Sequence, residues 1–230
     1  MTRTNPRRAR LFDLVLIGCV GFVLLTTLAM LFYPGGAQKN PQQLGYSFTL
    51  NFFSDLGRTV ALNGTANPIA HTLFTLALSF AGLALALFFV TFALFFWTTL
   101  PARCFSLLGA GLGIVAGAAF IGVALVTSDR NSPRHIYFVL LAFRCFLGAV
   151  LPFALAILTQ KSYPRLGAWI FLAFAGFLAA YIALITLGPT PQEPGGLTIQ
   201  VVGQKLIVYA SIVCVGTQSI VARRYLAHLK

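Results

Sequence analysis

Five polar residues carry the side-chain types that hydrolytic chemistry needs. Ser54 could act as a nucleophile, Asp55 or Asp129 as an orienting acid, and His71 or His135 as a base. Neither HxxxH nor HExxH occurs, so the histidines do not predict a zinc site, and the sequence predicts no metal and no cofactor. A membrane-embedded hydrolase using Ser54 therefore stays open, although these residues favour a non-catalytic role.

Two cations lie inside long apolar stretches, where charge is costly. Arg144 falls about 13 Å below His135 if the helix rises ~1.5 Å per residue, and Lys205 about 10 Å into the last apolar run. A basic group near the middle of a bilayer costs about 2.5–3.5 kcal/mol, so we expect both to face the interior or water and to have partners. Asp13, by contrast, lies at the edge of an apolar run, where Arg223 or Arg224 can pair with it.

No acid lies within these stretches to neutralise the two cations, which leaves three alternatives. Carbonyls and amides, including Gln204, can satisfy them. The loop that carries Asp55 can dip inward and bring its carboxylate within ion-pair distance of Lys205. An exogenous anion, such as a lipid phosphate or a carboxylate, can occupy the space. The candidate ligand-binding residues are Asp55, His71, Arg144, Gln204, Lys205 and Tyr209.

The composition indicates what kind of scaffold holds these residues. Hydrophobic residues make up 58% of the 230 and charged residues only 9%, which is typical of a polytopic membrane protein. The net charge of +12 does not point to nucleic acid, because the basic residues lie in short loops and tails, where they set orientation and meet anionic lipid. The four cysteines show no CxxC spacing and are expected to pack as small apolar residues.

Hydropathy predicts an all-α fold with six transmembrane helices in one domain that spans residues 1–230. The expected helices cover residues 11–33, 69–97, 104–127, 135–159, 166–187 and 198–225. The side with the termini carries ten Lys and Arg and the other side four, which places both termini in the cytoplasm. We therefore expect a multi-pass protein of a cell membrane, with a prokaryotic inner membrane as the favoured location.

The longest loop, residues 34–67, is too aromatic for a plain linker. It contains Tyr46, Phe48, Phe52 and Phe53, and we expect it to fold back onto the bundle as a lid, with a short helix around 48–58. A second feature lies in the third predicted helix, where three glycines share one face at four-residue spacing: Gly109, Gly113 and Gly117. Such a stripe lets another backbone approach closely, so it is a candidate contact for another membrane subunit.

Four sequence features together resemble a known family. They are SDLG at 54–57 after an aromatic outer loop, Asn67-Pro68 opening the second helix, His135 opening the fourth, and VVGQKLIVYA in the sixth. The pattern resembles, over nearly the whole chain, the uncharacterised six-span prokaryotic membrane family catalogued as domain of unknown function 998. The resemblance implies the topology and no established activity. Many members carry Glu-Arg where this chain has Gln204-Lys205, a departure that argues against a role requiring an acid there.

These observations predict a multi-pass membrane protein with an outward-facing polar pocket that binds a lipid headgroup or a small anion. Lys205 and Arg144 would form its cationic floor and the SDLG segment its cover. Membrane lipids are the expected partners, and nucleic acid is not. The alternatives are a structural subunit of a larger membrane complex and a membrane-embedded hydrolase.

Overall fold

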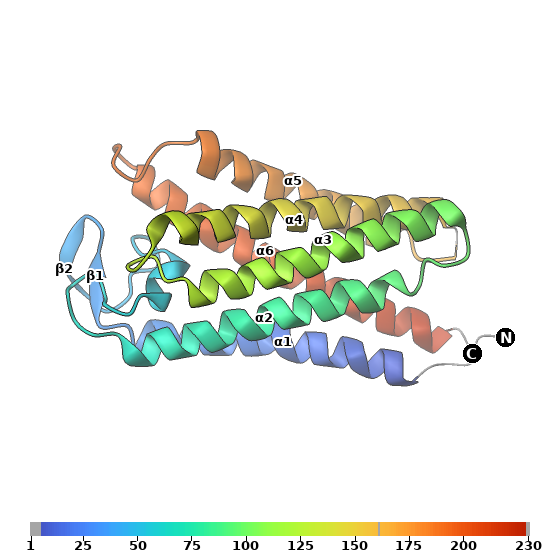
Figure 1. The fold of residues 1–230 in the computed structure, drawn as a ribbon, viewed down its shortest axis with the longest axis horizontal. Coiled ribbons are helices and arrows are strands. Elements are labelled where there is room, and N and C mark those ends of the chain that lie inside the picture. Colours follow the sequence, from blue (N-terminus) through green and yellow to red (C-terminus); the bar gives the residue numbers. More distant parts are fainter. Residues whose placement is uncertain (1–5, 161, 229–230) are drawn as a thin grey trace.

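The computed structural model describes residues 6–160 and 162–228, which form a bundle of six α-helices (Figure 1). The helices are α1 (Pro6–Leu31), α2 (Pro68–Ala93), α3 (Leu100–Leu125), α4 (Ser132–Thr159), α5 (Leu166–Leu187) and α6 (Gly196–His228). All six are long and apolar enough to cross a membrane. In lipid a helix satisfies its own backbone hydrogen bonds, which is why such runs fold this way. The predicted all-α, six-span class is confirmed.

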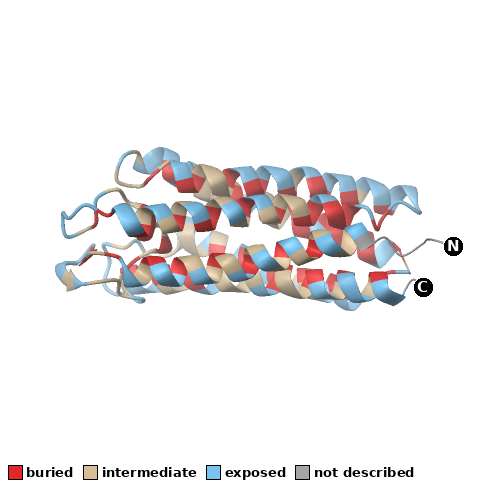
Figure 2. Ribbon diagram, turned by 90° about the horizontal axis from the view of Figure 1, so that it is seen from below, coloured by how far each residue is buried: buried red, intermediate tan, exposed pale blue. Residues whose placement is uncertain are grey.

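The helices form a closed ring. Each packs against the next in sequence, and α6 returns to pack against α1. We call the end where α1 begins and α6 ends the terminal end, and the opposite end the lid end (Figure 1). Along the helices, buried positions alternate with exposed ones, so each has one side turned to its neighbours (Figure 2).

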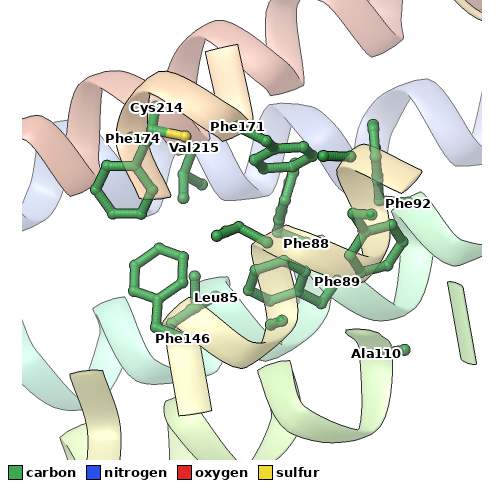
Figure 3. Packing of buried hydrophobic residues seen from close by; sticks show 14 of the residues in the cluster. Leu85, Phe88, Phe89, Phe92, Ala110, Phe146, Phe171, Phe174, Cys214 and Val215 are labelled. Atoms are coloured by element: carbon green, nitrogen blue, oxygen red, sulfur yellow. The ribbon is translucent and has the colours of Figure 1, made fainter. Parts of the chain in front are cut away.

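Aromatic rings from α2, α4 and α5 pack against one another inside the bundle (Figure 3). By their positions along these helices, most lie in the half nearest the terminal end. Phe92 of α2 is fully buried and lies edge-on to Phe153 of α4, Tyr163 and Phe171 of α5, with centroid distances of 5.2, 5.4 and 5.7 Å. Phe89 stacks on Phe153 at 5.4 Å. Edge-to-face and offset-stacked rings attract beyond the area they bury, so this half is a dense aromatic core.

The predicted glycine stripe on α3 lies inside the bundle. A Cβ at Gly109 would meet the ring of Phe153 on α4 at 2.6 Å, and one at Gly113 would overlap Phe89 on α2. Gly117 faces the backbone of Gly82 on α2 so closely that a side chain on either would overlap the other helix. The stripe therefore permits close backbone approach as predicted, but its partners are α2 and α4 of the same chain.

The lid, residues 34–67, connects α1 to α2. It opens with an antiparallel hairpin of β1 (Gly35–Ala37) and β2 (Asn40–Leu44) and continues into the 3-10 helix η1 (Phe53–Gly57). The short helix matches the expectation around 48–58, whereas the hairpin was not predicted, because strands of three and five residues leave no clear alternation. The lid covers the end of the bundle where α3 meets α4 and α5 meets α6 (Figure 1).

Candidate functional site

Lys205 of α6 lies beneath the lid with only 1% of its surface exposed. Its Nζ donates a hydrogen bond to the backbone carbonyl of Asn51. Three aromatic rings of the lid surround the same ammonium, those of Tyr46, Phe48 and Phe53, with centroids at 5.3, 5.1 and 5.6 Å. Ring faces attract cations strongly where water is excluded. The lid itself therefore supplies the partners of this cation.

Asn51 is the centre of the hydrogen bonding in the lid and is completely buried. Its Nδ2 donates to the carbonyl of Gly36 at 2.8 Å, and its Oδ1 accepts from the backbone N–H of Ser47 at 2.9 Å. Its own carbonyl accepts from Tyr46 Oη at 3.1 Å as well as from Lys205. Sequence reasoning missed this residue, because its partners become neighbours only once the loop has folded.

Asp55 folds down with the lid as expected but does not pair with Lys205. Its Oδ2 accepts from the backbone N–H of Phe52 at 2.8 Å and from Asn51 Nδ2 at 3.4 Å. No carboxylate oxygen of Asp55 comes within 4.0 Å of the Lys205 ammonium. The predicted ion pair is thus wrong, because Asp55 closes its own 3-10 turn while Lys205 is held by a carbonyl and rings.

Burial leaves the Asp55 carboxylate poorly solvated. It raises the pKa to about 6, although the hydrogen bonds from Phe52 and Asn51 oppose the shift. Among the described residues the single salt bridge joins Arg223 Nε to Asp13 Oδ1 at 3.0 Å, near the terminal end. That pair was expected from the sequence.

Gln204 and Tyr209 of α6 contact the same part of the lid. Gln204 Oε1 accepts from the backbone N–H of Phe53 at 2.7 Å, and the ring of Tyr209 lies edge-on to that of Phe53 at 5.7 Å. Neighbouring Ser54 lines a cavity together with Gln204. The structure therefore brings together Asp55, Gln204, Lys205 and Tyr209 of the predicted set, around Phe53.

The two histidines at the lid end are structural hydrogen-bonders. His71 Nδ1 lies 2.7 Å from the carbonyl of Gly57, and His135 Nδ1 lies 2.6 Å from that of Val126. A carbonyl only accepts, so each Nδ1 carries the proton. In the described part of the chain Ser54 makes no hydrogen bond to either histidine, and no three His, Cys, Asp or Glu residues cluster as metal ligands do. The geometry of a nucleophile paired with a base is therefore not present in this conformation.

Asp129, in the connection between α3 and α4, fastens the lid from the other side. Its Oδ2 accepts from the backbone N–H of Thr59 at 2.9 Å, from Thr59 Oγ1 at 2.7 Å and from the N–H of Val60 at 3.1 Å. Burial favours the neutral acid, but these hydrogen bonds outweigh it and hold the pKa of Asp129 well below its ordinary value. No sequence pattern signals this contact, because Thr59 and Asp129 are seventy positions apart.

Arg144 is separate from the site under the lid. Its side chain is exposed on the outside of α4, whereas the opposite side of α4 buries Phe143, Phe146 and Phe153. The bulky aromatic face is the one that fills the core, and it turns Arg144 outward. The expectation that Arg144 faces the interior beside Lys205 is therefore wrong.

A pair of apolar cavities lies between the lid and the aromatic core. The larger has a volume of about 80 Å³ and is lined by residues of α1, α2, α3, α4 and α6. The smaller, of about 40 Å³, reaches Ser54 and Gln204 under the lid. The two share five lining residues: Phe22, Leu78, Phe120, Phe143 and Val208. The two cavities are therefore neighbours, and together we call them the seam.

Comparison of the chain with protein-family models, with curated proteins and with solved structures found no match. The resemblance to the family catalogued as domain of unknown function 998 thus stays a prediction.

Proposed function

We propose that this membrane protein binds a lipid by taking up a short segment of one hydrocarbon chain in the seam of cavities beneath the lid. The observation that carries the proposal is the lining of the larger cavity, which is apolar apart from Ser211 and the thiol of Cys19. Apolar cavities stay free of water and accept apolar molecules. The walls of an empty cavity forgo dispersion contacts, which a hydrocarbon chain would restore.

The polar end of the seam suits the polar end of a lipid chain. Ser54 and Gln204 line the smaller cavity directly under the lid, where the Ser54 hydroxyl can bond an ester or hydroxyl group while the Gln204 amide oxygen is held by Phe53. This proposal keeps the lipid expected from the sequence but not the cationic floor, because Lys205 is held by the lid and Arg144 lies outside the bundle.

Photolabelling tests the proposal. The protein is reconstituted in vesicles of phosphatidylethanolamine and phosphatidylglycerol, the latter with a diazirine midway along one acyl chain. We expect adducts on Leu78 and Val208 in the cavity in addition to those on lipid-facing residues. Ala81→Phe, which fills the larger cavity, should lower the interior adducts several-fold. The matched control Ala118→Phe, on the exposed side of α3, should not change them. Adducts confined to exposed residues such as Phe80 would contradict the proposal, as would interior labelling that Ala81→Phe leaves intact.

A further inference from the structure

Arg144 sits halfway along a membrane-spanning helix. It lies twelve residues from Ser132 and fifteen from Thr159 in α4, or about 18 and 22 Å along the axis at ~1.5 Å per residue. The hydrocarbon core of a bilayer is ~30 Å thick, so each headgroup region is roughly 15 Å away from the centre. An arginine side chain cannot cover that distance, so snorkelling alone leaves this guanidinium in hydrocarbon.

Nothing in the described chain neutralises this guanidinium. The side chain is exposed and forms no hydrogen bond, ion pair or ring contact with any described residue. Such a group carries five donors that hydrocarbon cannot satisfy. Arginine at the centre of a transmembrane helix is among the costliest residues on insertion scales, even when the surroundings adapt. An unpaired cation at this depth therefore indicates a partner outside the chain.

The surface around Arg144 has the form of a helix-packing face. Residues on the outside of α4 recur at alternating spacings of four and three: Tyr137, Leu141, Arg144, Gly148, Leu151 and Leu155. Tyr137, Leu151 and Leu155 are exposed by 61, 40 and 46%, and Gly148 is a half-buried small residue beside Arg144. A repeat of 3.5 residues is the spacing with which two helices pack side by side in a left-handed supercoil.

We propose that this face of α4 docks a transmembrane helix of another protein that carries an Asp or Glu at mid-membrane depth. Charge decides the occupant, because a carboxylate accepts two hydrogen bonds from a guanidinium in matched geometry. A second copy of this chain cannot provide it. The four acids are Asp13 near the terminal end and Asp55, Asp129 and Glu193 at the lid end, so none lies at the depth of Arg144.

The test uses the whole protein, labelled with a donor dye on the exposed Cys104, in phosphatidylcholine and phosphatidylglycerol vesicles. The probes are leucine-rich transmembrane peptides that carry an acceptor dye and either a central Glu or a central Leu. Energy transfer should show the Glu peptide associating about tenfold more tightly than the Leu peptide, which corresponds to ~1.4 kcal/mol and is typical of an interhelical polar contact. Arg144→Leu should remove this preference, and Arg144→Lys should keep part of it.

A relocated arginine supplies the matched control. Phe80 of α2 is 55% exposed and lies twelve residues from the lid end of its helix, as Arg144 does in α4. The outer face of α2 has a similar spacing of exposed side chains, Leu76, Phe80 and Leu83, but carries Ala84 where α4 has Gly148. The double variant Arg144→Leu/Phe80→Arg should therefore recover the preference for the Glu peptide only in part. Equal binding of the two peptides to the unmodified protein overturns the proposal, and so does full recovery by the relocated arginine. Arg144-dependent association of two differently labelled copies, equal to that of the Glu peptide, would assign the face to a homodimer instead.

Discussion

At the terminal end the helices of this bundle meet through aromatic rings, and at the lid end they meet around a cavity that a loop covers. Phe88, Phe92, Phe153 and Phe171 fill the first region without hydrogen bonds between their side chains. The lid region has apolar cavities below and a layer of hydrogen bonds above, from Asn51, Lys205 and Asp129. Close packing dominates at the terminal end, although Gln160 Nε2 also donates to the carbonyl of Phe95 at 2.8 Å and Arg223 pairs with Asp13 there. Hydrogen bonds to the lid dominate at the other end.

This difference suggests that one half of the bundle is rigid and that the other can open to a ligand. Dispersion between packed rings is lost steeply with distance, so the aromatic region has no partly open form of low energy. Hydrogen bonds to loop backbone break locally, and the elements that admit ligands generally belong to the less stable parts of a fold. We infer that the aromatic half holds the helices in place, whereas the lid half can open to admit the hydrocarbon tail of the proposed lipid.

Phe92→Ala, in the aromatic half, should have the largest effect on stability. The variant removes a fully buried ring that contacts α4 and α5, so the free energy of unfolding should fall by about 3–5 kcal/mol. Thermal unfolding in detergent measures the loss. The lipid-facing control Phe80→Ala should change stability little, and a similar loss in both variants would mean that the terminal end does not depend on its rings.

The charge on Asp55 gives the lid a dependence on pH that the aromatic half lacks. Because its pKa of about 6 lies above the ordinary value of 3.8, the folded protein binds more protons than the unfolded chain between these pH values. The contribution of Asp55 to stability is then largest below pH 4 and falls as the pH rises to 6, by up to about 3 kcal/mol at ~1.36 kcal/mol per pKa unit.

Thermal unfolding of the wild type and of Asp55→Asn, followed from pH 4 to 7, checks this sign. The amide cannot ionise, so the variant should show a flatter profile and should exceed the wild type in stability at pH 7. A wild-type profile that rises across this interval while that of the variant stays flat would contradict the assignment.

Gly113→Leu tests how closely the helices must approach. A side chain at this position overlaps the ring of Phe89, so the variant should lose about 1–3 kcal/mol of stability through overpacking. Gly111, two residues away, is exposed, and a Cβ added there would meet nothing within 4 Å, so Gly111→Leu is the matched control. Unchanged melting of Gly113→Leu in detergent would show that α2 and α3 can separate without cost.

The sequence predicts the helices well because hydrocarbon imposes one solution on each apolar run. α5 has the bounds expected, and Pro68 occupies the first turn of α2 as predicted. The helical period puts Tyr137, Arg144 and Gly148 on one face of α4. It could not tell that this face turns outward, because in a membrane protein the core and the surroundings are both apolar.

The lid resisted prediction for a different reason. Its structure depends on contacts between residues far apart in sequence, such as Phe53 with Gln204 and Thr59 with Asp129. Counting charges suggested that Asp55 would neutralise Lys205. The structure instead satisfies the cation with a backbone carbonyl, which was the first of the three alternatives left open by the sequence, and with three aromatic rings, which were not foreseen.

Thr59→Val should have the smallest effect on stability, and it distinguishes the contribution of Asp129 from that of Asp55. Valine keeps the backbone N–H bond to Asp129 but removes the one from Oγ1, at a cost of about 1.5 kcal/mol for a hydrogen bond to a charged group. The pKa of Asp129 is depressed, so the contribution of Asp129 to stability is present above pH 3.8 and is lost as the pH falls below that value, opposite in sign to that of Asp55.

Hydrogen exchange at the amides of Thr59 and Val60 should therefore be faster in Thr59→Val than in the wild type at pH 6. The difference should persist at pH 4, because these hydrogen bonds keep Asp129 ionised there, and should shrink only at a far lower pH. Thr65→Val, at an exposed lid threonine, should show neither change. A difference between Thr59→Val and the wild type that disappears between pH 6 and pH 4 would mean that these hydrogen bonds do not hold Asp129 ionised.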